Sequence, residues 1–226
     1  RPIRICNVTS GSEYGYRENN GKWSPSYPDN LPPVVNVGQG SPTNVMSGME
    51  ARFPEKYRRG LFAFDWSYGI IYHIGLEAQG SSYSAKVEEF ISGSPLPLTD
   101  GAIGPDGAMY FLTGGRKIES DLYRIYYGDN TMKTDPLASN ESAEVVEARN
   151  TRKKLEAFQQ KPDPAALDIA WPFLNNNDRF IRYAARIAVE HQPVAQWQQK
   201  ALSEKDPVIL TQAMIALARN GNKDVK

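Results

Sequence analysis

The chain has 226 residues, which is enough for one large domain or two smaller domains with a buried core. Its 26 basic and 26 acidic residues cancel, so the composition lacks the excess positive charge that binds nucleic acids and acidic membranes. The one cysteine, Cys6, cannot form a disulfide within the chain, and no apolar run is long enough to span a membrane.

Glycine and aromatic residues divide the chain into two parts. Seventeen of the 18 glycines and 18 of the 24 aromatic residues lie in residues 1–128. The rest of the chain is rich in alanine and contains one glycine. Glycine-punctuated aromatic sequence favours short strands joined by turns, whereas alanine-rich sequence favours helices. Residues 129–141 are polar and have no period, which predicts a linker between a β-rich part and a helical part at residues 142–226.

Short apolar stretches with turn signals between them recur about every ten residues in the β-rich part. No segment with a helical period separates them, so we expect an antiparallel sandwich, barrel or propeller rather than a parallel α/β sheet. Pro105, Asp106 and Gly107 are typical of a tight turn. The predicted strands cover residues 3–9, 33–38, 42–48, 60–66, 69–75, 85–93, 99–104, 108–114 and 121–128.

The helical part contains two segments that align at a shift of 28 residues. Asp178 and Asp206 stand at the expected N-cap of these two helices. Asp163 and Pro164 indicate a third helix start of the same kind. Repeated helices with alanines on their packing faces are typical of a solenoid of HEAT-like helix pairs.

The residues alone show no catalytic or metal-binding motif. His73 and His191 lie far apart, in different parts of the chain, and form neither a metal site nor a catalytic triad. A single histidine in a strand, such as His73, is more often packed than catalytic. The stretch with Asp100 and Asp106 lacks the alternating oxygen ligands and the closing glutamate of a calcium loop. We therefore assign no catalytic residue and no metal ligand.

Four stretches of the β-rich part resemble the closing blades of the quinoprotein glucose and sorbosone dehydrogenases, which are six-bladed β-propellers. They are "ICNVTSGSEYGY", "GSPTNVM", "LFAFDWSYGIIYHIGL" and "PLTDGAIGPDGAMYFLTGG" with "SDLYRIYY". The stretch "NNDRFIRYAARIAVEHQ" is similar to a planctomycete-type bacterial family that joins such a propeller to HEAT-like repeats and a c-type cytochrome domain. The resemblance implies an all-β partial propeller of antiparallel blades over residues 1–128 and an all-α HEAT-like domain over residues 142–226. It also implies that the chain is a middle fragment of a longer protein.

For function, the resemblance implies a periplasmic or exported sugar or aldehyde dehydrogenase. Its cofactors would be pyrroloquinoline quinone and Ca²⁺, and its electrons would pass to haem c in a downstream domain. The family's quinone-contacting lysine falls on Ser67, and two arginines that hold the quinone's carboxylates fall on Pro97 and Thr99. Neutral groups at these positions lack the charge and the bidentate geometry that a tricarboxylate requires. The family's catalytic histidine belongs to an earlier blade.

Ligands of a propeller lie over its central channel, so the candidate ligand-facing residues lie at the entries of two inner strands and in a hairpin turn. Asp100 either accepts a hydrogen bond from a sugar hydroxyl or helps to hold a cation, or it caps the entry of its strand. The candidates are Thr43, Asn44, Trp66, Ser67, Thr99 and Asp100.

Two classes of function follow from the sequence. The first is a part of a quinoprotein-like dehydrogenase with a small sugar or aldehyde substrate. The second is a non-enzymatic scaffold or binding subunit of a larger complex. An incomplete propeller leaves sheet edges exposed, so we expect missing blades or a protein partner to cover them.

Overall fold

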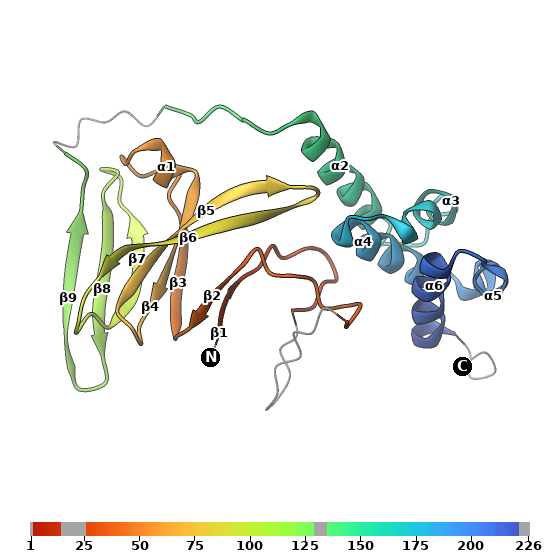
Figure 1. Cartoon of the computed structure of the whole chain (residues 1–226), viewed down its shortest axis with the longest axis horizontal. Helices are drawn as coiled ribbons and strands as arrows, with labels where there is room; N and C mark the ends of the chain where they lie inside the picture. The colour runs from red at the N-terminus through yellow and green to blue at the C-terminus, as the bar shows by residue number, and fades with distance from the viewer. Residues whose placement is uncertain (1, 15–25, 129–134, 222–226) are drawn as a thin grey trace. The chain divides into compact units, whose positions relative to one another are not determined.

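The structure is a computed structural model, which describes residues 2–14, 26–128 and 135–221 (Figure 1). The chain divides into two compact units, and each is described by itself. The first unit consists of Arg1–Cys6, Pro33–Glu77 and Tyr83–Asn140. The second unit consists of Asn7–Pro32, Ala78–Ser82 and Glu141–Lys226.

Nine strands form three antiparallel sheets among the described residues, one strand near each predicted stretch (Figure 1). The two-stranded sheet pairs β1 (Pro2–Ile5) with β2 (Val35–Gln39). The four-stranded sheet follows chain order and contains β3 (Pro42–Ser47), β4 (Gly60–Asp65), β5 (Ile70–Gln79) and β6 (Ser82–Ser92). The three-stranded sheet contains β7 (Leu98–Ile103), β8 (Met109–Gly115) and β9 (Ile118–Ile125). A short helix, α1 (Glu55–Arg58), lies between β3 and β4 in the chain.

The β7–β8 connection is the tight turn that the sequence predicts. Gly107 has a φ of 75°, which a residue with a side chain rarely adopts. The carboxylate of Asp106 accepts a hydrogen bond from the Ala108 N–H at 3.1 Å, which closes the turn. The prediction for this turn is confirmed.

The core of the first unit lies where the four-stranded and three-stranded sheets pack together. Alternate residues of a strand point to the same face, which places Phe62 and Phe64 of β4 and Met109 and Phe111 of β8 in this core. The rings of Phe64 and Phe111 meet edge to face, with centroids 6.5 Å apart. Full burial of such a side chain contributes about 1.5–3 kcal/mol, so these residues dominate the packing of the unit.

The second unit is built around helices that start at polar caps. Asp178 and Asp206 are the N-caps of α4 and α6, as predicted. The third predicted start is displaced: Asp163 accepts from the Ala165 N–H at 2.8 Å in a turn, and Ala165 itself precedes the helix. The helices are α2 (Ala143–Ala157), α3 (Ala166–Ala170), α4 (Arg179–Glu190), α5 (Gln198–Ser203) and α6 (Pro207–Asn220), with 3-10 turns η1 (Trp171–Asn175) and η2 (Val194–Gln196).

Helix α4 is central to the core of the second unit, where it packs against α2, α3 and α6. Its buried alanines, Ala184, Ala185 and Ala188, allow the neighbouring helices to approach closely. Trp197 is fully buried and donates its indole N–H to the Gln192 carbonyl at 3.1 Å. In the described part of the chain, no helix is both long and apolar enough to cross a membrane.

The predicted fold class, an all-β partial propeller followed by an all-α HEAT-like domain, is wrong. The described residues form three small antiparallel sheets and six α-helices, which is a mixed fold of strand and helix. Composition indicated the type of each element, but it did not indicate how distant segments group. Leu31, from the β-rich part, is fully buried against Phe180, Tyr183 and Ile187 of α4, so its segment belongs to the unit that contains the helices.

The predicted linker is described only from residue 135 onward, because residues 129–134 lie outside the described residues. Its described part is held by two arginines of the first unit. The guanidinium of Arg58 donates to the Asp135 carbonyl at 2.6 Å, and that of Arg59 donates to the Ala138 carbonyl at 3.1 Å. Residues 15–25 and 222–226, which the two predicted domains include, also lie outside the described residues.

Candidate functional site

Strand β3 sends two of the candidate side chains to the backbone of β7. The Thr43 hydroxyl donates to the Leu98 carbonyl at 3.0 Å, and the Asn44 amide donates to the Gly101 carbonyl at 2.8 Å. These bonds bring the entry of β3 beside the stretch of β7 that contains Thr99. The structure thus brings together the two strand entries that the sequence singled out.

Thr99 and Asp100 make local contacts on β7. The Thr99 hydroxyl donates to the Leu112 carbonyl on the adjacent strand β8 at 3.1 Å. Asp100 is exposed, and its Oδ1 accepts from the N–H of Gly101, the next residue, at 2.8 Å. Because the Asp100 carboxylate stays open to solvent, it can still accept a hydrogen bond from a ligand hydroxyl.

Trp66 and Ser67 lie in the β4–β5 turn. The Trp66 indole N–H donates to the Gly114 carbonyl at 3.0 Å, and the Ser67 hydroxyl donates to the Ser41 hydroxyl at 2.7 Å. Trp66 is 39% exposed, so its ring partly faces solvent while its polar atom holds the turn to β8. Hydrogen bonds therefore fix the turn to β8 and to Ser41, the residue before β3.

Asp65 organises this turn, and the sequence analysis missed it. Its side chain is fully buried, and its Oδ1 accepts from the Ser41 N–H at 2.8 Å and the Ser67 N–H at 3.0 Å. Its Oδ2 has no hydrogen-bond partner among the described residues. The available signal was an aspartate followed two residues later by serine at a strand end, which is typical of an Asx turn.

These side chains do not fit a quinone tricarboxylate. The residues at the family's charged positions, Ser67, Pro97 and Thr99, are neutral, and their polar atoms are used within the first unit: Ser67 bonds Ser41, the Pro97 carbonyl accepts from the Gly114 N–H, and Thr99 bonds a carbonyl. A tricarboxylate in such a site would lose its hydration without gaining opposite charge. Of the residues that the structure describes, no three His, Cys, Asp or Glu side chains are grouped so that they could hold a metal ion.

His73 lies opposite Phe62 in the second strand of the β4–β5 hairpin. Its ring is 2% exposed and meets the Tyr57 ring edge-on, with centroids 5.0 Å apart. Its Nδ1 is 3.0 Å from Glu88, whose other oxygen accepts from Lys56 at 2.7 Å. Burial lowers the pKa of His73, and the hydrogen bond with Glu88 offsets this only in part. His73 is thus a packed, neutral ring at the wall of a pocket of about 500 Å³.

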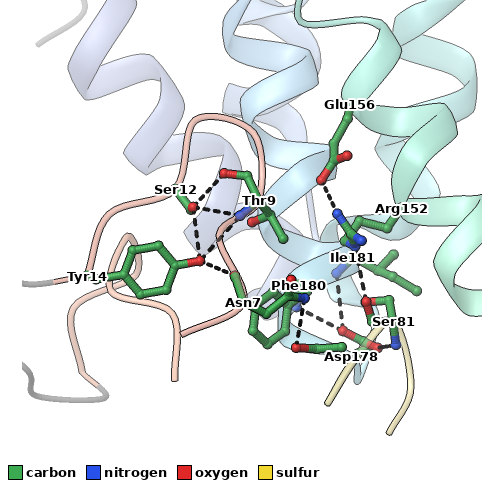
Figure 2. Close-up of polar contacts among 11 residues, drawn as sticks. Asn7, Thr9, Ser12, Tyr14, Ser81, Arg152, Glu156, Asp178, Phe180 and Ile181 are labelled. Carbon is green, nitrogen blue, oxygen red and sulfur yellow. Dashed lines mark hydrogen bonds and ion pairs between the residues drawn. The ribbon is translucent and has the colours of Figure 1, made fainter. Parts of the chain in front are cut away.

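In the second unit, Asp178 and Arg152 hold the tip of the β5–β6 hairpin (Figure 2). Ser81 is fully buried at this tip; its N–H donates to Asp178 Oδ2 at 2.7 Å, and its carbonyl accepts from Arg152 Nε at 3.1 Å. The other oxygen of Asp178 caps α4 by accepting from the Phe180 N–H at 2.8 Å and the Ile181 N–H at 3.2 Å. One carboxylate therefore both starts a helix and fixes a hairpin 97 positions away in the sequence.

Residues 7–14 form a local network beside this tip (Figure 2). The Ser12 hydroxyl donates to the Thr9 carbonyl at 2.5 Å, and the Tyr14 hydroxyl donates to the Asn7 carbonyl. The Asn7 amide donates to the Ser82 hydroxyl at 3.1 Å, which connects the network to the hairpin. These contacts explain why residues 7–14 belong to the second unit rather than to the sheets.

No protein-family model matches the chain, and no curated protein matches its sequence. Among solved structures, the chain is similar to a proposed oxidoreductase (glucose dehydrogenase) from Thermus thermophilus, with a TM-score of 0.41 and 21% sequence identity. The similarity covers 53% of this chain and 35% of that chain. This chain therefore spans about a third of the length of the structure that it matches.

Proposed function

We propose that this chain is a non-enzymatic binding or scaffold part of a larger protein or complex. The proposal depends on one observation, which is that the polar side-chain atoms of the candidate site are already bonded within the first unit. Thr43, Asn44, Trp66 and Thr99 each donate to a backbone carbonyl of another strand of the first unit. A side chain that satisfies a strand carbonyl contributes about 1 kcal/mol to folding, and it would have to break that bond to bind a ligand.

The charges of the site favour the same conclusion. None of the six candidate residues is cationic, and Asp100 is the one residue among them with a charged side chain. Enzymes that use anionic cofactors bind them with arginine or lysine, because bidentate and charge-assisted hydrogen bonds compensate for the hydration that the anion loses. Strands that are bonded to one another in this way are suited to present a fixed surface rather than to hold an anionic cofactor.

The second candidate function is a part of a quinoprotein-like sugar or aldehyde dehydrogenase. The exposed carboxylate of Asp100 favours it, because that group can accept a hydrogen bond from a sugar hydroxyl. The sequence resemblance favours it as well. In this case the whole protein would use pyrroloquinoline quinone and Ca²⁺, work in the periplasm, and pass electrons to a c-type cytochrome.

A quinone-binding assay separates the two candidates. The purified chain is mixed with pyrroloquinoline quinone and CaCl₂, and the absorption spectrum of the quinone is recorded. The scaffold proposal predicts the same spectrum as that of the mixture without protein. A spectral shift that the wild type shows and Asp100→Asn loses would overturn the proposal in favour of the dehydrogenase.

A stability measurement tests the structural role of the same residues. Thr43→Val and Thr99→Val keep the side-chain shape but remove the hydroxyl donor, so each should lower the free energy of unfolding of the first unit by about 1 kcal/mol. The matched control is Thr211→Val, whose hydroxyl donates within its own helix to the Pro207 carbonyl at 2.7 Å. This control should leave the stability of the first unit unchanged. Unaltered stability in both β-strand variants would contradict the structural role.

A further inference from the structure

Helix α4 carries three arginines on one face in the second unit. Arg179, Arg182 and Arg186 are spaced by three and four residues, and this spacing places side chains next to one another along a helix. Arg219 of α6 joins the cluster, since it and Arg186 pair with the same carboxylate, that of Asp29. Four guanidinium groups are thus gathered at the junction of α4 and α6.

The acidic groups of the cluster serve only two of these four arginines. Asp29 pairs with Arg186 and lies 2.9 Å from Arg219. Glu190 lies 3.3 Å from Arg186 and 3.7 Å from Arg219. No carboxylate of the described residues pairs with the other two arginines of the cluster, so positive charge remains uncompensated at the first turns of α4.

Arg179 and Arg182 are held in place by backbone carbonyls, each through a single nitrogen. Arg179 Nη2 donates to the carbonyls of Tyr27, at 2.7 Å, and Asn30, at 3.0 Å. Arg182 Nη1 donates to the carbonyl of Asn176. The remaining N–H groups of both guanidinium groups have no hydrogen-bond partner in the described part of the chain. Burial lowers the pKa of Arg179, and the positive charges of the neighbouring arginines lower it further. The two arginines are therefore fixed in position with donors to spare.

Both arginines line one pocket of about 220 Å³. This is smaller than the roughly 300–1,000 Å³ of pockets for drug-sized ligands, so it suits a single small group. The pocket wall also includes Gln212 and Tyr183, and the Tyr183 hydroxyl is already used in a hydrogen bond to the Gly11 carbonyl at 2.5 Å. No residue of the wall is acidic.

We propose that this pocket binds a small oxyanion, namely a phosphate or carboxylate group, between Arg179 and Arg182. The free guanidinium N–H groups would donate charge-assisted hydrogen bonds to its oxygens, and Gln212 would supply a neutral donor. The anion would supply the negative charge that the acidic residues of the cluster do not. This site is independent of the function proposed above, because it lies in the second unit and uses none of the same residues.

The test is a titration of the full chain with inorganic phosphate, and separately with acetate, at constant ionic strength with chloride as the reference salt. The matched variants are Arg182→Gln, which removes a guanidinium of the wall, and Arg219→Gln, which removes one outside the wall. Loss of one charge-assisted contact corresponds to a loss of about tenfold or more in affinity. We expect that loss for Arg182→Gln and a loss of less than about threefold for Arg219→Gln, since screening weakens charges that make no contact.

Each outcome of the titration bears on the proposal. Saturable binding of phosphate alone assigns the site to phosphate groups, and binding of acetate with the same variant pattern assigns it to carboxylates. NMR of the wild-type chain locates the ligand without any variant, because the side-chain amide of Gln212 should shift on titration. No saturable binding, an unmoved Gln212 amide, or equal losses for Arg182→Gln and Arg219→Gln would overturn the proposal.

Discussion

Replacing Asp178 and Asp206 in turn by asparagine tests whether the α4 N-cap also holds the β5–β6 hairpin. Both aspartates cap a helix through Oδ1, and asparagine caps about as well as aspartate. Asparagine has one carbonyl oxygen, so at position 178 it can satisfy either the cap or the Ser81 N–H, but not both. At position 206 the second oxygen accepts only from an exposed amide, that of Asn175, at 3.3 Å. The loss of charge at the helix start is common to both variants and cancels in the comparison.

The expected difference follows from the burial of Ser81. A buried N–H left without an acceptor costs about 1–3 kcal/mol, so Asp178→Asn should destabilise the helical unit by about that much more than Asp206→Asn. Urea unfolding followed by far-UV circular dichroism measures the difference. In Asp178→Asn, hydrogen exchange at the Ser81 amide should accelerate about tenfold for each 1.4 kcal/mol by which the substitution destabilises the hairpin tip. In Asp206→Asn, exchange at this amide should stay unchanged. Equal destabilisation of the two variants with unchanged Ser81 exchange would refute the role assigned to Asp178.

Three further predictions concern single residues. Gly80→Ala should destabilise the chain by about 1–3 kcal/mol in urea unfolding, because Gly80 has a φ of 53° and an added Cβ would lie 2.4 Å from Asp178 Oδ2. A change below about 0.5 kcal/mol would show that the tip of the β5–β6 hairpin relaxes around the added methyl group. The folded-state pKa of His73 lies below its usual 6.5, so the unfolded chain binds the proton more readily. The free energy of unfolding should therefore be highest above pH 6.5 and fall as the pH drops below that value. A urea midpoint with the same pH dependence in His73→Gln as in wild type would contradict this. The hydrogen bond from the Arg124 guanidinium, 2.7 Å away, is the main cause that lowers the pKa of Asp106 to about 2. An NMR titration should therefore show a higher pKa of Asp106 in Arg124→Gln than in wild type. An unchanged pKa would show that Arg124 is not the cause.

Sequence reasoning succeeded where the chemistry is local. The N-caps at Asp178 and Asp206 depend on one side chain and the next three residues, and both were predicted. The turn at residues 105–107 likewise depends on backbone preferences that proline, aspartate and glycine carry wherever they occur. Strands were found near all nine predicted stretches for the same reason.

The grouping of the elements could not be predicted, because it depends on contacts between distant segments. Nothing near Ser81 in the sequence indicates that its N–H bonds a carboxylate 97 positions later. The burial of Leu31 against α4 is equally invisible to a pattern that extends over ten residues. The family resemblance supplied a grouping by analogy, and that analogy gave the wrong fold class.

The candidate site shows the same limit. The sequence analysis named residues 43 and 99 as candidates at two strand entries, but it gave no indication that their hydroxyl groups bond carbonyls of the neighbouring strands. The arginines of α4 had a readable signal in their spacing of three and four residues. Such spacing is also usual on a solvated helix face, and only the structure shows that two of these arginines line a pocket without acidic partners.

In the function that we propose, Thr43, Trp66, Ser67 and Thr99 hold the first unit together instead of holding a cofactor. Calorimetric titration of the full chain with pyrroloquinoline quinone in the presence of Ca²⁺ tests this role, with Asp100→Asn as the comparison variant. We expect no saturable heat in either protein at micromolar concentrations of quinone. Saturable binding by the wild type that is weakened in Asp100→Asn would contradict it.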